Sequence, residues 1–206
     1  KPLLDCMQLL PTRGLITLCD IGAAGEIEPR WKPFSKNLQY IGFEPDKRSR
    51  ERILNQAYLF KSYEILPYAL SDADKPRNLN LCRKPQVSSL YKPNRDFLDR
   101  FPDSERFDVM QVERVDCVTL DKLNLANIDF LKLDIEGAEN DVIKGAQTTL
   151  NLVLGLELEV EFIEIYSGQG LFGDICNELS SHGFEFVDFV HLSRWQRNGI
   201  YGHGQC

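Results

Sequence analysis

Five short apolar runs, each ending at or near an acidic residue, dominate the sequence. They are Leu15–Cys19, Leu38–Phe43, Glu64–Leu70, Ile128–Leu133 and Leu152–Leu158. Near-continuous apolar runs of this length are typical of strands that are buried on both faces of a sheet. Amphipathic stretches lie between several of the runs. The alternation predicts an α/β, Rossmann-like fold with a mostly parallel sheet and helices on both faces.

Helices are expected where apolar residues recur at helical spacing. The predicted helices are 46–57, 138–150 and 171–182. Asp46 is a suitable N-cap for the first, and Gly183 a suitable terminator for the third. A last strand is predicted over 184–190.

The stretch from about 74 to 118 departs from this alternation. It contains two extended pieces, 78–82 and 109–118, on either side of a polar segment. We interpret it as an insertion before the fourth strand of the sheet and as a cover for a substrate. With no linker or internal repeat, residues 1–206 are expected to form a single domain whose last strand is short or incomplete.

The charge of the chain argues against two classes of partner. Its 206 residues include 24 lysines and arginines against 31 aspartates and glutamates, which gives a formal net charge of −7. This balance disfavours binding to nucleic acid or to anionic lipid. The most apolar stretch, Leu150–Ile165, is interrupted by four glutamates. We therefore expect no nucleic-acid partner and no membrane-spanning segment.

The six cysteines are scattered along the chain. No Cys-x-x-Cys pair is present, and no histidine lies at ligand spacing from a cysteine. We assign no metal ligands on this basis and expect no disulfide scaffold. Free thiols in a chain of this size indicate a reducing compartment, which predicts a cytoplasmic protein.

Acidic residues follow the first four predicted strands. They are Asp20, Glu44, Asp72 and Asp134, and Glu136 follows the last of them. Ligands of open α/β sheets bind beyond the carboxyl ends of the strands, near the change in strand order. We therefore expect these residues to surround a common pocket. For each one separately, capping of the following helix is the competing explanation.

The first two strand ends indicate the kind of ligand. Asp20-x-Gly22-x-x-Gly25 allows a sharp turn and close approach of a ligand to the backbone, and Glu44 follows Gly22 at the spacing of a ribose-binding carboxylate. A dinucleotide site would show G-x-G-x-x-G, and Asp20 would repel a pyrophosphate. A cationic cofactor with a ribose, S-adenosylmethionine, fits better. A dinucleotide-binding Rossmann oxidoreductase and a non-catalytic cofactor-binding module remain as alternatives.

Four segments carry a family resemblance. They are Asp20–Gly25, Gly42–Asp46, Ala69–Asp72 and Asp129–Glu139. In this order they resemble the FkbM family of S-adenosylmethionine-dependent methyltransferases, and the similarity extends over roughly Leu15–Val190. The resemblance implies a class I methyltransferase fold and transfer of a methyl group to a hydroxyl of a small molecule or a sugar. A small-molecule or glycan acceptor is therefore the expected partner.

The resemblance also implies roles for individual residues. The expected cofactor-binding residues are Asp20, Gly22, Ala23 and Gly25 at the methionine end, Glu44, Pro45 and Asp46 at the ribose, Ser71 and Asp72 near the adenine, and Asp134 near the transferred methyl group. Glu136 would face the acceptor together with Asp134.

Transfer to a hydroxyl requires removal of its proton, which a carboxylate at a strand end can perform. The predicted catalytic residues are Asp134 first, Glu136 second and Glu159 in the acceptor pocket. The competing explanation for Asp134 is that it caps the helix beginning near Ala138. Lys132 is interpreted as a structural ion-pair partner. A divalent cation such as Mg²⁺ bound by Asp134 is an alternative that we do not expect.

Overall fold

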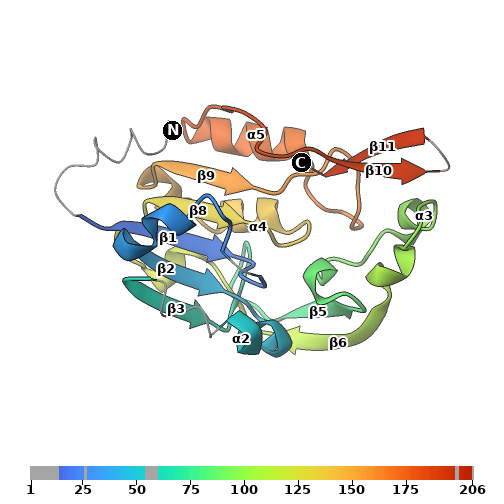
Figure 1. The fold of residues 1–206 in the computed structure, drawn as a ribbon, viewed down its shortest axis with the longest axis horizontal. Helices are drawn as coiled ribbons and strands as arrows, with labels where there is room; N and C mark the ends of the chain where they lie inside the picture. Colours follow the sequence, from blue (N-terminus) through green and yellow to red (C-terminus); the bar gives the residue numbers. More distant parts are fainter. Residues whose placement is uncertain (1–13, 26, 54–59, 198–199, 206) are drawn as a thin grey trace.

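The computed structural model describes residues 14–25, 27–53, 60–197 and 200–205. Its centre is a parallel five-stranded sheet in the order β3-β2-β1-β8-β9 (Figure 1). The strands are β1 Ile16–Ile21, β2 Leu38–Phe43, β3 Ser62–Leu66, β8 Phe130–Leu133 and β9 Gly155–Leu158. The chain adds strands on one side of β1 and then on the other, so the order changes between β1 and β8. The predicted Rossmann-like, mostly parallel fold is confirmed.

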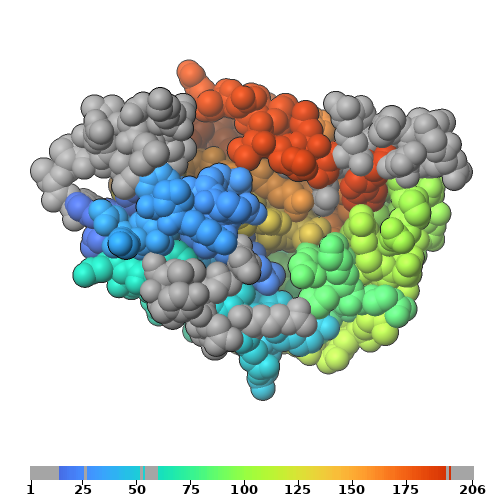
Figure 2. Space-filling model, in the orientation of Figure 1, coloured from blue at the N-terminus to red at the C-terminus, as the bar shows by residue number. Residues whose placement is uncertain are grey.

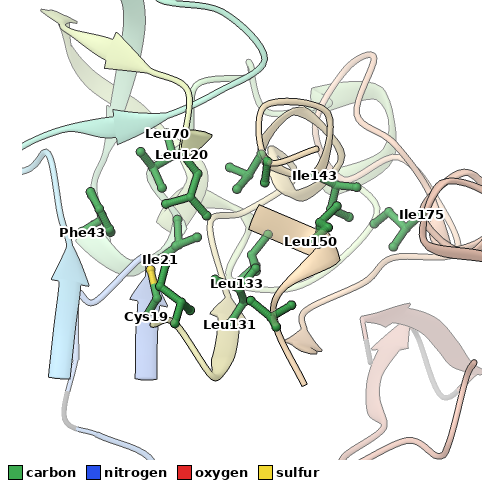
Figure 3. Close-up of a cluster of buried hydrophobic side chains, with 14 of the residues drawn as sticks. Cys19, Ile21, Phe43, Leu70, Leu120, Leu131, Leu133, Ile143, Leu150 and Ile175 are labelled. Atoms are coloured by element: carbon green, nitrogen blue, oxygen red, sulfur yellow. The ribbon is translucent and has the colours of Figure 1, made fainter. Parts of the chain in front are cut away.

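One face of the sheet packs against two helices, α4 Glu139–Lys144 and α5 Phe172–Ser181. Figure 3 shows the core on this side, where strand residues such as Ile21 and Leu133 lie among Ile143, Leu150 and Ile175. The alternation of side chains along a strand places the neighbouring residues on the opposite face. The sheet is therefore buried on both sides, as its apolar strands require.

The opposite face has its own core. The 3-10 helix η1 Lys32–Asn37 and α2 Lys47–Ile53 contribute to it. Trp31, Phe34 and Ile53 pack there against Leu18 and Leu38 of the sheet.

Two of the predicted helix ends are confirmed. The Asp46 side chain accepts a hydrogen bond from the backbone N–H of Arg48 at 2.9 Å and so caps α2. Residues 54–59, where this helix was expected to continue, lie outside the described residues. Gly183, with φ +83°, follows α5 in the left-handed conformation that ends helices.

Helix α4 is shorter than the predicted 138–150. It ends at Lys144, and a 3-10 turn, η6 Thr149–Asn151, follows. A side chain at Gly145 would overlap with the carbonyl oxygen of Ser71, so the chain passes very close to that backbone. Asp121 then accepts hydrogen bonds from the N–H groups of Thr148 and Thr149, both at 2.8 Å. These tertiary contacts replace the continuous helix.

The insertion before β8 consists of two extended pieces, as predicted. β5 Arg77–Cys82 pairs antiparallel with β6 Val109–Val115. A two-residue parallel pair, β4 Ala69–Leu70 with β7 Cys117–Val118, joins the insertion to the sheet. Its remaining elements are η3 Pro85–Val87, α3 Arg95–Leu98, η4 Ser104–Phe107 and, after β7, η5 Asp121–Leu123. Figure 1 shows β5, β6 and α3 beside the carboxyl edge of the sheet.

The predicted last strand over 184–190 is wrong. Phe186 and Phe189 of this segment join an aromatic cluster with Phe162 and Phe172 in place of a strand ladder. The final strands are instead an antiparallel hairpin, β10 Ser193–Arg197 and β11 Ile200–Gln205. Its Trp195 ring packs against aromatic rings of the insertion. No helix among the described residues has the length and apolar character needed to cross a bilayer.

Candidate functional site

A pocket of about 590 Å³, open to solvent, lies at the carboxyl edge of the sheet. Its walls come from the ends of β1 and β2, from β4, from the loop after β8 and from residues 79–90 of the insertion. In Figure 2 this face is hollowed between the blue N-terminal part and the green insertion. The pocket lies at the change in strand order, where open α/β sheets bind ligands.

Gly22 brings the ends of β1, β2 and β8 together. Its φ of +88° favours glycine, and a side chain there would overlap with the carbonyl oxygen of Asp134. The N–H groups of Gly22 and Ala23 both donate to the carbonyl of Phe43 at 3.0 Å. The N–H of Asp134 donates to the carbonyl of Ile21 at 3.0 Å. The three loops at the base of the pocket are therefore fixed to one another by backbone contacts.

Glu44 presents a buried carboxyl group to the pocket, at the end of β2. One oxygen, Oε1, accepts a hydrogen bond from the N–H of Asp46 at 2.7 Å. Burial raises the pKa of Glu44 from 4.5 to about 7, although that hydrogen bond and the charge of Arg50 oppose the rise. The carboxyl group of Glu44 therefore changes from its neutral to its ionised form near neutral pH.

A chain of polar contacts ties Asp20 to Asp134. The Lys132 ammonium lies 3.2 Å from Asp20 Oδ1 and 3.4 Å from Asp134 Oδ2, and the Tyr40 hydroxyl donates to Asp20 Oδ2 at 2.7 Å. Lys132 and Asp20 are buried, whereas the Asp134 side chain is 45% exposed. Lys132 is thus an ion-pair partner, as predicted. Asp134 makes no side-chain cap to α4, so the competing explanation as a helix cap fails.

Glu136 occupies a strained position in the loop after β8. Its φ of +58° is uncommon for a residue other than glycine. The Ser89 hydroxyl donates to its carbonyl at 2.6 Å, and the Tyr166 hydroxyl donates to its Oε2 at 2.7 Å. Burial raises the pKa of Glu136 to about 8, and the charge of Asp134 adds to the rise.

Glu159 completes a group of three carboxylates with Asp134 and Glu136. One oxygen of each lies within 4.8 Å of an oxygen of the other two. Burial, followed by the charge of Glu136, raises the pKa of Glu159 well above its usual value. Glu139, whose Oε1 accepts from the N–H of Ile135 at 2.8 Å, is buried nearby and has its pKa raised to about 8 by burial. The group can hold a proton or a cation.

The predicted site residues divide into two sets. Those that line the pocket are Gly22, Glu44, Pro45, Asp46, Asp134 and Glu136, with Glu159 adjoining the last two. Those absent from its wall are Asp20, Ala23, Gly25, Ser71 and Asp72.

The residues of the second set have other contacts. Asp20 is held by Lys132 and Tyr40, and Ala23 packs in the core. The Ser71 hydroxyl is fully buried and accepts a hydrogen bond from Arg77 at 2.8 Å. These five residues do not line the pocket, and the roles that the resemblance implies for them stay predictions.

Several wall residues were not found from the sequence. Tyr68, Leu79 and the loop 85–90 line the pocket. Only the general position of the insertion pointed to Leu79 and the loop 85–90, and no prediction pointed to Tyr68. Tyr166 is fully buried, and its hydroxyl donates a hydrogen bond to the carboxylate of Glu136. No periodicity or motif marks such a supporting role.

The parallel sheet with its pocket at the β1–β8 switch defines a Rossmann-like architecture, which is consistent with a methyltransferase fold. Residues 20–186 match the family described as the methyltransferase FkbM domain, and the chain belongs to this family. Membership of this family supports the assignment of the chain as a methyltransferase.

Among solved structures, the methyltransferase FkbM from Methylobacillus flagellatus KT is similar, with a TM-score of 0.52 and 15% sequence identity. The alignment covers 96% of this chain and 44% of that one, so the chain spans less than half the length of that protein. At this identity the likeness shows the fold alone. No curated protein matches the chain.

Proposed function

We propose that this chain is an S-adenosylmethionine-dependent O-methyltransferase that acts on a hydroxyl group of a small molecule or glycan. The observation that carries the proposal is the placement of Glu44, Gly22 and Asp134 around one pocket. These residues supply a buried carboxyl group at the end of β2, a close backbone approach at the end of β1 and a half-exposed carboxylate at the end of β8.

The residues present fit the cofactor. A carboxylate at the end of the second strand accepts hydrogen bonds from the two hydroxyls of a ribose. The absence of a side chain at Gly22 lets the end of β1 approach the backbone of Asp134 closely, which places Asp134 beside the part of the pocket where the rest of the cofactor would lie. Asp134 and Glu136 add negative charge, which favours a sulfonium. When bound, S-adenosylmethionine supplies an electrophilic methyl group.

The proposed work of the protein is to orient the acceptor and to take its proton. Holding a hydroxyl oxygen about 3–3.5 Å from the methyl carbon supplies much of the rate. Removal of the proton by a positioned base contributes about 10²–10⁴-fold. Asp134 is the first candidate base because it lines the pocket and is the most exposed of the three carboxylates. Residues 85–90 of the insertion form the wall against which the acceptor would lie.

The loop after β1 argues against a dinucleotide. A pyrophosphate site places the diphosphate at the N-terminus of a helix that directly follows the glycine loop. In the part of the chain that the structure describes, Gly22 and Gly25 lead instead to an irregular stretch and to the 3-10 helix η1. Among these described residues, no α-helix N-terminus therefore follows the glycine loop to receive a diphosphate.

We place the reaction in the cytoplasm. Cys19, Cys82, Cys117 and Cys176 are free thiols among the described residues. Unpaired cysteines are typical of proteins that work in a reducing compartment.

Isothermal titration calorimetry tests the cofactor. The wild-type protein should bind S-adenosylhomocysteine and not NAD. Glu44→Gln should weaken this binding about tenfold or more, because charged hydrogen bonds contribute about 1.5–3 kcal/mol. Glu64→Gln, at an exposed carboxylate on β3, is the matched control and should bind like the wild type. Binding of NAD alone would refute the proposal. Cofactor binding without methyl transfer to any of a panel of sugars and hydroxylated compounds would favour the non-catalytic module.

A further inference from the structure

Neighbouring strands bring the carboxylates of Asp134, Glu136 and Glu159 together. Leu133 of β8 and Leu158 of β9 are paired in register, so Asp134 and Glu159 leave the sheet at the same level. The left-handed backbone at Glu136 turns the loop after β8, and the Tyr166 hydroxyl holds its side chain. The result is three carboxylates with oxygens within 4.8 Å of one another.

This cluster contains more negative charge than its neighbours neutralise. Lys132 lies beside Asp134, but the same ammonium also neutralises Asp20. The charge of Lys84 acts on Glu136. Three carboxylates at this separation repel one another strongly, so they require a shared proton or a further cation.

An orphaned atom supplies a second, independent indication. Glu159 Oε2 is buried and has no hydrogen-bond partner among the described residues. A buried acceptor without a partner costs about 1–3 kcal/mol, and more when it is charged. An ion between the three side chains would give this oxygen its missing partner.

The donor set indicates the class of ion. The cluster offers only carboxylate oxygens, the ligands preferred by Mg²⁺, Mn²⁺ and Ca²⁺, and neither cysteine nor histidine. Oxygen ligands lie about 2.0–2.1 Å from Mg²⁺ and about 2.3–2.6 Å from Ca²⁺, so two ligands of one ion are at most about 4–5 Å apart. The three oxygens, all within 4.8 Å of one another, are therefore close enough to share a single ion of this class. The exposed side of Asp134 leaves room for water or a hydroxyl as further ligands.

We propose that Asp134, Glu136 and Glu159 bind one hard divalent cation at the inner end of the pocket, where it positions the hydroxyl group of the acceptor. The acceptor part of this statement rests on the proposed methyltransferase function, whereas the binding of the ion does not. A divalent cation lowers the pKa of a hydroxyl that it contacts, which assists the loss of its proton.

Titration of the chelator-treated full chain with Mn²⁺, followed by electron paramagnetic resonance, tests the site without cofactor or acceptor. We expect saturable binding of one Mn²⁺ per chain and its displacement by Mg²⁺ or Ca²⁺. Glu159→Gln should weaken binding at least about tenfold, since even the loss of an indirect partner of a metal has effects of about 10–100-fold. Asp134→Asn should act in the same direction.

Glu157→Gln is the matched control. Glu157 lies on the same strand, but its carboxylate pairs with Arg30, so Mn²⁺ affinity should stay within about twofold of the wild type. Urea denaturation of each variant verifies that it is folded. Absence of saturable Mn²⁺ binding to the wild type, or equal affinity of folded Glu159→Gln, overturns the proposal and leaves a shared proton as the explanation. Binding of S-adenosylhomocysteine without any Mn²⁺ binding would refute the cation and leave the proposed function intact.

Discussion

Replacement of Glu44 by glutamine should make the cofactor-free protein more stable, although it removes a group of the binding site. The folded protein raises the pKa of Glu44 from 4.5 to about 7, chiefly through burial. The ionised form is therefore disfavoured in the folded state by about 3 kcal/mol relative to the unfolded chain. Glutamine retains the shape of the side chain and can still accept the hydrogen bond from the N–H of Asp46, but it has no charge to bury.

The sign of the pH dependence follows from proton binding. Between pH 4.5 and about 7 the folded protein holds a proton on Glu44 that the unfolded chain has released. The free energy of unfolding of the wild type thus falls as the pH rises through this window, and the fall is complete above pH 7. Glu44→Gln lacks this contribution. Its advantage over the wild type should grow by about 2 kcal/mol between pH 5.5 and pH 8.5.

Urea denaturation at several pH values measures this difference directly. Glu64→Gln, which removes an exposed carboxylate from β3, should show a difference from the wild type that hardly varies with pH. An advantage of Glu44→Gln that is the same at pH 5.5 and pH 8.5, or a loss of stability that grows with pH, would refute the assignment of a buried carboxyl group. Together with calorimetry, the experiment separates weaker cofactor binding from a folding defect.

Two further substitutions test how the site is built. Gly22→Ala should lower the free energy of unfolding by at least about 2 kcal/mol, because of the positive φ and the overlap with Asp134. Gly25→Ala is the control, since a side chain there has open space, and it should change the free energy of unfolding by less than about 0.5 kcal/mol. Equal losses of the two variants in urea denaturation would argue against the close approach. Lys132→Met should lower the free energy of unfolding by about 3 kcal/mol, because it leaves Asp20 buried without its cation. Lys122→Met, at an exposed pair with Asp74, is the control and should lower it by less than about 1 kcal/mol. A loss below about 1 kcal/mol for Lys132→Met would contradict the structural role of this ion pair.

Four strands of the sheet could be predicted because each is an apolar run bounded by polar residues, whereas the predicted strand Glu64–Leu70 is divided into β3 Ser62–Leu66 and β4 Ala69–Leu70, which lies in a separate sheet. β2 has the predicted bounds, and β1, β8 and β9 lie within a few residues of theirs. The end of α4 could not be predicted, since it depends on the proximity of Gly145 to Ser71, a contact between residues distant in sequence. The predicted strand over 184–190 is wrong for a similar reason. Its phenylalanines fit a strand pattern and an aromatic cluster equally well, so the sequence does not distinguish between the two.

The site shows the same division. Residues placed directly after a strand, such as Glu44 and Asp134, reach the pocket because the sheet carries them there. Asp20 belongs to the same pattern but lies one residue inside β1, where Lys132 and Tyr40 hold its side chain away from the pocket wall. The spacing of residues in the sequence predicts which of them lie at the carboxyl edge of the sheet. Whether their side chains point into the pocket depends on the packing of neighbouring strands.

The contact between Gly22 and the carbonyl of Asp134 couples the proposed cofactor-binding loop to the loop that carries the proposed base. A change that moves one loop must displace the other, so neither can diverge freely without harming both. The wall formed by residues 85–90 contacts the loop after β8 through the Ser89 hydroxyl, but it belongs to an insertion joined to the sheet through the short β4–β7 pair. Related proteins that act on different acceptors should therefore differ most in this wall and least in the backbone around Gly22.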